Sequence, residues 1–346
     1  MNQERDLGKP FQIQTEEYLT GPARLGGIAM FPAKSLAPWY LDRAFVDQMG
    51  IRREKDDPTS DRQYMVVNKK SQMVTQRTQP EFARMHLDVL DGGEMQQLVF
   101  DGDHLLFPLH KHGKIDTTVH TTKDIPAVDQ GHAVASWLEA TFGKELRFVR
   151  QVDDQPRERN EPLIQIAGLQ QLLRLQDSSP ITAMAHAGLY QLNQLLPQSL
   201  NMEAISFRMN LLIFGEINEH AAVGKFLRIG LGEDAIYLYI WRPKERCPMP
   251  GVDQNTGVHR EADKKRLGDV YQVILRSEQM HDLLGIPEHL RHAPKKNGPG
   301  WVPKSMLGAD LFPINPGYIN AGDPIAIVNE VPQHILQAAR ERMRIG

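Results

Sequence analysis

The stretch from Phe207 to Gly257 constrains this chain more than any other part of it. Two apolar runs of strand-like composition, 207–215 and 235–241, lead into a cationic, proline-rich segment that holds the single cysteine, Cys247. One cysteine in 346 residues excludes an intrachain disulfide, an iron–sulfur cluster held by this chain and a cysteine-rich zinc site. We therefore expect any soft-metal chemistry to centre on one thiol.

The surroundings of Cys247 favour a functional thiol. Three cations, Arg242, Lys244 and Arg246, lie within five residues of it, and a thiolate beside cations has a lowered pKa. Prolines follow at 248 and 250, which is typical of a rigid exposed loop. Asp253, six residues beyond the cysteine, is a candidate to orient a water or move a proton at a bound metal.

Two other interpretations of Cys247 stay open at this point. An inert buried thiol is the usual fate of a lone cysteine. A nucleophilic cysteine without a metal would need a base, and His186 and His259 are candidates that would have to approach in space. A separate metal site is also conceivable where His110 and His112 share one face of a strand, although this segment reads equally as a polar hairpin tip.

The order of elements predicts an α+β, β-rich fold. Strands are expected at 26–31, at 61–68 with a hairpin partner at 71–77, in short pieces over 84–121, and at 146–151, 224–230, 235–241 and 325–328. Helices are expected at 128–143 with Asp129 as N-cap and Gly143 as stop, and at 167–174, 187–196, 263–271 and 331–344. Residues 291–322 form a long passage rich in proline and glycine, and the purpose of its 291–315 loop is open.

Four segments follow from this order. Residues 1–20 form a flexible lead-in, 21–150 a first domain, 151–330 a second domain, and 331–346 a C-terminal helix, with the polar residues 153–162 as the crossing between domains. Cations and hydroxyls at the ends of strands in the first domain can join Cys247 in one cavity. A cavity that binds a phosphate and a flat polar ring would use the cations near Cys247 together with Lys34, Arg62, Arg77, Arg208 and Asn210.

Composition limits the partners. Charged residues make up 24% of the chain, the net charge is −3 and the pI is near 6.5, so no nucleic-acid partner is expected. The N-terminus has no signal-peptide apolar core and no apolar run is long enough to cross a bilayer, so we expect a cytoplasmic protein without membrane contact.

Several motifs in a consistent order resemble a known family. Phe207-Arg-x-Asn-Leu-Leu-Ile-x-Gly, Arg246-Cys247 followed by Val252-Asp-x-x-Thr-Gly, and Gly322-Asp-Pro-Ile are similar to the MOSC domain, named for the C-terminal domain of molybdenum cofactor sulfurase. Upstream, Pro32-x-Lys-Ser-Leu, Asp61-Arg-x-Tyr-Met-Val-Val and Thr75-x-Arg-x-x-Pro resemble the N-terminal β-barrel partner found in amidoxime-reducing components and bacterial relatives.

The resemblance implies two β-barrel domains with flanking helices and a molybdenum cofactor, molybdopterin with molybdenum bound by Cys247. It implies reduction of N-hydroxylated compounds, with Asp253 near the metal. The residues implied to hold the pterin and its phosphate are Lys34, Ser35, Arg62, Thr75, Arg77, Arg208, Asn210 and Arg246.

This chain departs from the family pattern where relatives carry Ser-x-x-Ser-Leu and it has Ala185-His-Ala-Gly-Leu. Tyr64 stands in place of a tryptophan, and the tryptophan expected near Glu219 is absent. No cysteines remain for a ferredoxin domain, so electrons are expected from a separate reductase, ferredoxin or flavoprotein. Two alternatives remain: a non-catalytic carrier of the cofactor or its sulfur, and a metal-free cysteine hydrolase or transferase.

Overall fold

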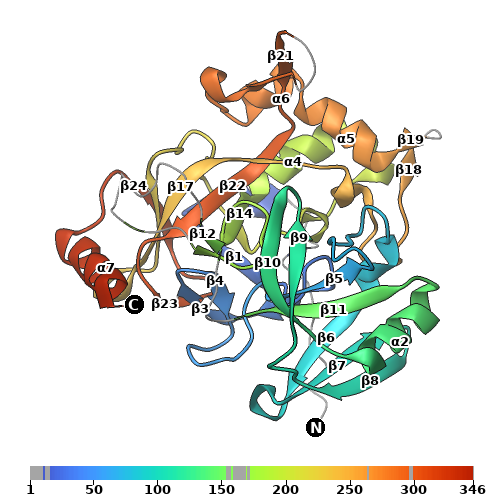
Figure 1. The fold of residues 1–346 in the computed structure, drawn as a ribbon. Helices are drawn as coiled ribbons and strands as arrows, with labels where there is room; N and C mark the ends of the chain where they lie inside the picture. Colours follow the sequence, from blue (N-terminus) through green and yellow to red (C-terminus); the bar gives the residue numbers. More distant parts are fainter. Residues whose placement is uncertain are drawn as a thin grey trace.

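The structure is a computed structural model that describes residues 11, 16–152, 157–158, 169, 172–262, 265–295 and 299–345. It confirms an α+β, β-rich fold (Figure 1). Five α-helices occur in the described residues: α2 (His132–Phe142), α4 (His186–Leu195), α5 (Leu267–Leu275), α6 (Glu278–Leu283) and α7 (Gln333–Ile345). None of the helices in these residues is long and apolar enough to cross a membrane.

An eight-stranded sheet forms the centre of the molecule. Its spatial order is β2 (Trp39–Leu41), β1 (Arg24–Met30), β15 (Leu211–Phe214), β14 (Ile181–Ala185), β22 (Met306–Pro313), β17 (Ile236–Glu245), β16 (Phe226–Ile229) and β24 (Ile325–Val328). Neighbours run antiparallel except β14 and β15, which are parallel. Two strands from the start of the chain therefore belong to the same sheet as strands from the second half.

Smaller sheets surround this centre. The first is β5 (Tyr64–Asn68), β11 (Leu146–Gln151), β10 (Thr122–Asp129) and β9 (Lys114–Val119), in that order, and the second is β6 (His86–Leu90), β7 (Met95–Phe100) and β8 (Asp103–Pro108). The third joins both ends of the chain: β23 (Gly317–Asn320), β3 (Arg43–Asp47) and β4 (Gly50–Arg52). Two-stranded ribbons are β12 (Arg157–Glu158) with β13 (Leu172–Leu173), β18 (Glu261–Ala262) with β19 (Lys265–Arg266), and β20 (His292–Pro294) with β21 (Trp301–Pro303).

Apolar side chains cover both faces of the central sheet. In β15, Leu212 and Phe214 face a core shared with α4, α5 and α6, whereas Leu211 and Ile213 face a second core on the other side. This division follows from the two-residue period of a strand. Each fully buried leucine contributes about 1.5–3 kcal/mol by leaving water. Figure 1 shows α4, α5 and α6 gathered on one side of the molecule and α7 apart from them.

Several predicted helices and turns keep their place but change their ends. Helix α2 begins after Gly131, and Asp129 is the last residue of β10, where its Oδ1 accepts a hydrogen bond from the Gly131 N–H at 2.8 Å. The N-cap prediction for Asp129 is therefore wrong, while the stop at Gly143 is confirmed by its left-handed φ of 64°. Helices α4 and α7 are confirmed to within two residues, and α5 begins at Leu267.

Other predictions for local structure are wrong or hold only in part. Leu172–Leu173 form a strand, not part of a helix over 167–174, whose other residues lie largely outside the described ones. The 71–77 segment does return beside β5, with a bridge from Val67 to Met73 and a hydrogen bond from the Val74 N–H to the Val66 carbonyl oxygen at 2.8 Å, but it forms no strand of its own and Gln72 also bridges Thr118, because β11 is the main partner of β5. Phe11 is buried and η1 (Glu16–Tyr18) packs on the core, so these parts of the lead-in are ordered.

The largest correction concerns the passage at 291–322. It contains β22, whose eight residues are all buried in the middle of the central sheet. Gly308 explains how a strand with this composition fits there. Its φ is +77°, and a Cβ at this position would lie 2.2 Å from the Cε of Met209 and 2.6 Å from the carbonyl oxygen of Ala183. Only glycine is free of both the steric and the conformational cost.

Candidate functional site

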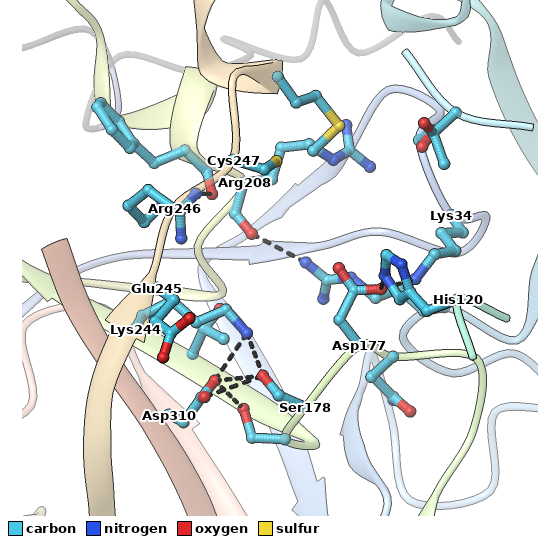
Figure 2. Close-up of a pocket in the computed structure, with 18 of the residues that line it drawn as sticks. Lys34, His120, Asp177, Ser178, Arg208, Lys244, Glu245, Arg246, Cys247 and Asp310 are labelled. Atoms are coloured by element: carbon cyan, nitrogen blue, oxygen red, sulfur yellow. Dashed lines mark hydrogen bonds and ion pairs between the residues drawn. The ribbon is translucent and has the colours of Figure 1, made fainter. Parts of the chain in front are cut away.

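A cavity of about 360 Å³ opens beside Cys247, where both halves of the chain meet. Seven of its side chains are cations and three are carboxylates. We call it the cationic cavity. It is lined by Lys34, Ser35, Arg62, Thr75, Arg77, His120, Gln176, Asp177, Ser178, Ser179, Thr182, Phe207, Arg208, Arg242, Lys244, Glu245, Arg246, Cys247, Met249 and Asp310. Figure 2 shows how the labelled members converge on it.

Most of the side chains that the sequence predicts for the site line this cavity. They are Lys34, Ser35, Arg62, Thr75, Arg77, Arg208, Arg246 and Cys247. Asn210 and Asp253 are not among the lining residues. The loops that follow β1 and β5 thus bring their cations to the end of β17, as a shared cavity requires.

Helix α5 holds the loop that carries Cys247. The Tyr271 hydroxyl donates a hydrogen bond to the carbonyl oxygen of Cys247, and Gln272 Nε2 donates to the carbonyl oxygen of Arg246 at 2.6 Å. The loop and helix touch through glycine, since a Cβ on Gly268 would lie 2.3 Å from the carbonyl oxygen of Pro248. The thiol is therefore presented by a fixed loop with no room for a larger residue behind it.

Arg208 presents an unsatisfied cation to the cavity. It follows the 3-10 helix η5 (Ala204–Phe207), and its φ of 54° turns the chain before β15 begins. The residue is 5% exposed, its Cζ lies 4.2 Å from the centre of the Phe31 ring, and no described group accepts from its Nη1 or Nη2. Burial, followed by the nearby Arg62, lowers its pKa to about 9. Such nitrogens point to an anionic ligand.

The other arginines surround the thiol. Arg246 Nη2 donates to the carbonyl oxygen of Phe207 at 2.5 Å, while its buried Nε has no partner within the described chain. Burial lowers the pKa of Arg246. Burial would also lower the pKa of Arg77, but its contact with the Cys247 sulfur outweighs this and raises it. Arg77 is thus the cation whose guanidinium contacts the Cys247 side chain directly.

Asn210 is a buried structural link rather than a lining residue. It is fully buried, its Nδ2 donates to Asp61 Oδ1 at 2.9 Å, and its Oδ1 accepts from the Thr182 N–H at 3.1 Å. Arg62, from the left-handed turn before β5, donates to the carbonyl oxygen of Arg208 at 2.9 Å and forms an ion pair with Asp61. Asn210 therefore positions Arg62 and Arg208 without facing the cavity.

An ion-pair cluster that the sequence analysis missed centres on Asp177. This carboxylate binds both Lys34 and His120, with His120 Nε2 at 2.7 Å from Oδ1. Burial alone would raise the pKa of Asp177, but Lys34, His120 and Lys244 hold it well below its usual range. Burial lowers the pKa of Lys34 to about 8 in spite of Asp177. In sequence, the only signal is the polar run 176–179 ahead of β14.

A second missed cluster centres on Asp310 in β22. Lys244 lies 2.8 Å from its Oδ1, Arg242 lies 3.1 Å from its Oδ2, and the hydroxyls of Ser178 and Ser179 donate to it at 2.7–2.9 Å. Burial would raise the pKa of Asp310, but Lys244 and Arg242 lower it. The cluster holds the two β17 cations at the edge of the cavity, as Figure 2 shows for Lys244.

Asp253 takes a structural role. Its Oδ1 accepts from the N–H groups of Asn255 and Thr256, both at 2.9 Å, which closes a turn. The two histidines considered as bases for Cys247 do not line the cavity either: His186 is buried against Tyr18 and Phe214, and His259 forms a bridge with Val252. His110 and His112 lie in a loop, so the strand geometry assumed for a metal pair is wrong.

Comparison with known proteins defines the class. Residues 22–145 match the MOSC N-terminal beta barrel domain and residues 170–326 match the MOSC domain. The chain therefore belongs to the proteins that combine these two MOSC domains. The second of them is a domain family that binds the molybdenum cofactor.

Curated relatives narrow the class. Mitochondrial amidoxime-reducing component 1 of Homo sapiens is 27% identical over 311 residues, which cover 87% of this chain and 82% of that protein. The protein of the same name from Danio rerio is 24% identical over 284 residues, covering 81% and 84%. Among solved structures, the YUAD protein of Bacillus subtilis is 10% identical and covers 90% of this chain and 98% of that one, with a TM-score of 0.34.

Proposed function

We propose that this protein binds a molybdenum cofactor in the cationic cavity and reduces N-hydroxylated compounds with electrons from a separate donor protein. The observation that carries the proposal is one thiol set among seven cations, with two buried guanidinium nitrogens of Arg208 that lack a partner in the described chain. The names of the amidoxime-reducing relatives support the reaction class. No nucleic acid or membrane partner is proposed.

The residues fit a group that carries a phosphate, a flat polar ring and a soft metal. Cys247 would supply the thiolate to molybdenum, a bond that soft metals favour. Lys34, Ser35 and Arg62 line one part of the cavity and would bind phosphate, because ammonium and guanidinium groups are strong donors to its oxygens. Arg208, Arg246, Thr75 and Arg77 would bind the ring and its substituents. Asn210 would act through Arg62 and Arg208.

When bound, the cofactor supplies two-electron redox chemistry at molybdenum. The protein holds the thiolate beside Arg77 and provides a positive field that attracts anionic groups and stabilises negative charge on oxygen. Reduction of an N-hydroxyl compound takes two electrons and two protons, breaks the N–O bond and releases water. The Asp253 carboxylate closes a turn. We therefore propose only that the loop that carries Asp253 lies near the metal.

The decisive experiment replaces the proposed ligand. Wild type and Cys247→Ala are produced in a host that makes the cofactor, and molybdenum is measured by elemental analysis. We expect one molybdenum per wild-type chain and almost none in Cys247→Ala. Hydroxylamine reduction with dithionite-reduced methyl viologen should follow the metal content.

Asp253→Asn is the matched comparison in the same loop, because the asparagine Oδ1 keeps the turn. It should retain the metal. A wild-type protein without molybdenum would contradict cofactor binding, and a Cys247→Ala protein that kept metal and activity would show that another group is the ligand.

The position of Asp253 also favours a second candidate, a carrier that passes the cofactor to another protein. A carrier needs the thiol ligand but no acid beside the metal, and the Asp253 carboxylate is engaged in its turn. A loaded protein that reduces no N-hydroxylated compound, but activates a cofactor-free molybdenum enzyme when mixed with it, would establish the carrier role.

A further inference from the structure

Two glutamines join the two MOSC domains beside the cationic cavity. Gln76 belongs to the first domain and is fully buried, and Gln254 belongs to the loop that follows Cys247 in the second. Each amide donates to the other: Gln76 Nε2 lies 3.3 Å from Gln254 Oε1, and Gln254 Nε2 lies 3.1 Å from Gln76 Oε1. Both positions are left open in the family motifs Thr75-x-Arg and Val252-Asp-x-x-Thr-Gly, so the motifs do not account for the pair.

Each glutamine also binds the backbone of its own domain. Gln76 Nε2 donates to the carbonyl oxygen of Ser35 at 2.7 Å, and Gln254 Nε2 donates to the carbonyl oxygen of Val252 at 3.1 Å. Ser35 lines the cavity, and Val252 follows Cys247 by five residues. The pair therefore connects a wall of the cavity in the first domain to the loop that carries the thiol.

Arg77, the next residue after Gln76, depends on this connection. The carbonyl oxygen of Thr75 accepts from the N–H groups of Thr78 and Gln79, both at 3.0 Å, so Arg77 lies in a closed turn. Its guanidinium forms a hydrogen bond with the Cys247 sulfur, and its buried Nε has no partner in the described part of the chain. The turn must therefore be held beside the Cys247 loop for this contact to form.

A second contact keeps the two domains together next to the pair. A Cβ on Gly257, at the end of the same loop, would lie 2.9 Å from the Cα of Glu81 and 3.4 Å from the carbonyl oxygen of Pro80. Both of these belong to the 3-10 helix η2 (Pro80–Arg84) of the first domain. Because this packing does not involve the amides, a protein without the pair should still fold.

We propose that Gln76 and Gln254 are positioning residues, whose amide pair holds the Arg77 guanidinium against the sulfur of Cys247. Neither glutamine lines the cavity, so the pair acts through Arg77 and not on a ligand. The inference goes beyond the proposed function and applies to the cavity with or without a cofactor.

The test uses the thiol of the cofactor-free protein. Iodoacetate, an anion, and iodoacetamide, its neutral analogue, each form a carbon–sulfur bond to Cys247 and release iodide. The chain has no other cysteine, so the mass of the intact protein reports both rates. Both reagents meet the same sulfur, and its degree of ionisation therefore cancels from the ratio of the two rates. A cation held at the sulfur raises this ratio, because it attracts only the anionic reagent.

Gln76→Met and Gln254→Met should each lower the ratio of the iodoacetate rate to the iodoacetamide rate by about fivefold, as should Arg77→Met. The amides act as one pair, so the double variant Gln76→Met/Gln254→Met should lower the ratio no further than either single change. For the same reason, Gln76→Met should have no additional effect in a chain that already carries Arg77→Met.

Gln130→Met is the matched control. Gln130 is also buried in the first domain and donates to two carbonyl oxygens, of His110 and Val128, but it does not line the cavity. This variant should lower the thermal midpoint and keep the wild-type ratio. A wild-type ratio in both glutamine variants, or an equal fall in Gln130→Met, would overturn the inference. Molybdenum does not enter the measurement, so that outcome would leave the proposed function standing.

Discussion

Lys34 shows how burial sets the charge of a single residue at this site. Its ammonium is taken out of water and shares Asp177 with His120, and burial lowers its pKa to about 8. Below that pH the side chain is a cation, and above it a neutral amine. The affinity of the cavity for an anion should therefore fall as pH rises through this value.

Sulfate tests this, because its charge is constant over the range. We expect cofactor-free wild type to bind sulfate about tenfold or more weakly at pH 9.5 than at pH 7, as measured by isothermal titration calorimetry. Lys34→Met should bind weakly at pH 7 and show little change up to pH 8.5. Lys69→Met is the control, since Lys69 is exposed and outside the cavity. A flat wild-type profile would mean that Lys34 does not titrate in this range.

At the scale of elements, α5 and the Cys247 loop form one unit. Tyr271 is fully buried and its hydroxyl satisfies the Cys247 carbonyl. Tyr271→Phe keeps the ring and removes the hydrogen bond, so it should cost about 1 kcal/mol of the free energy of unfolding. If the Cys247 loop loses a similar amount of local stability, iodoacetamide should alkylate Cys247 about fivefold faster in cofactor-free Tyr271→Phe than in cofactor-free wild type.

Tyr239→Phe serves as the comparison, because Tyr239 is also buried but packs in the core around α7. Its alkylation rate should equal that of wild type. Equal rates in wild type and Tyr271→Phe would show that the Gln272 hydrogen bond and the glycine contacts are enough to restrain the loop.

Elements with a strong pattern could be predicted from the sequence, and those shaped by tertiary contacts could not. The leucines of α4 repeat at helical spacing, so the helix was found. Strand β22 carries glycine, aspartate and proline, and its buried Asp310 is compatible with a core only because Lys244, Arg242 and two serines satisfy it. No local sequence pattern indicates that these partners, which are distant in sequence, lie beside Asp310. Asp177 was missed for the same reason, whereas the cations were found because their motifs are local.

At the scale of the whole molecule, the two MOSC domains are interlocked. Strands β1 and β2 extend the central sheet beside β15, β3 pairs with β23 near the other end of the chain, and Asp61 binds Asn210. The domain boundary at residue 150 therefore remains a prediction. The central sheet and the β23–β3–β4 sheet both contain strands from before and after this residue.

This arrangement predicts one cooperative unfolding transition. Leu138→Ala, a substitution of a fully buried residue of α2, should cost about 2–5 kcal/mol. Urea unfolding followed by far-UV circular dichroism and by tryptophan fluorescence should shift as one coincident curve. Leu283→Ala, at an exposed leucine, should leave the midpoint unchanged. Two separate transitions, with only one shifted by Leu138→Ala, would show that the halves unfold independently.

The pairing of β1 with β15 and of β3 with β23 has a consequence for biosynthesis. About 180 residues must be made after β1 before its partner begins, and β3 waits for a strand near residue 317. The unpaired edges and apolar faces of these early strands stay uncovered while the ribosome completes the chain, and sheets with such distant partners close slowly. The nascent protein is thus an obvious client for chaperones until its last strands emerge.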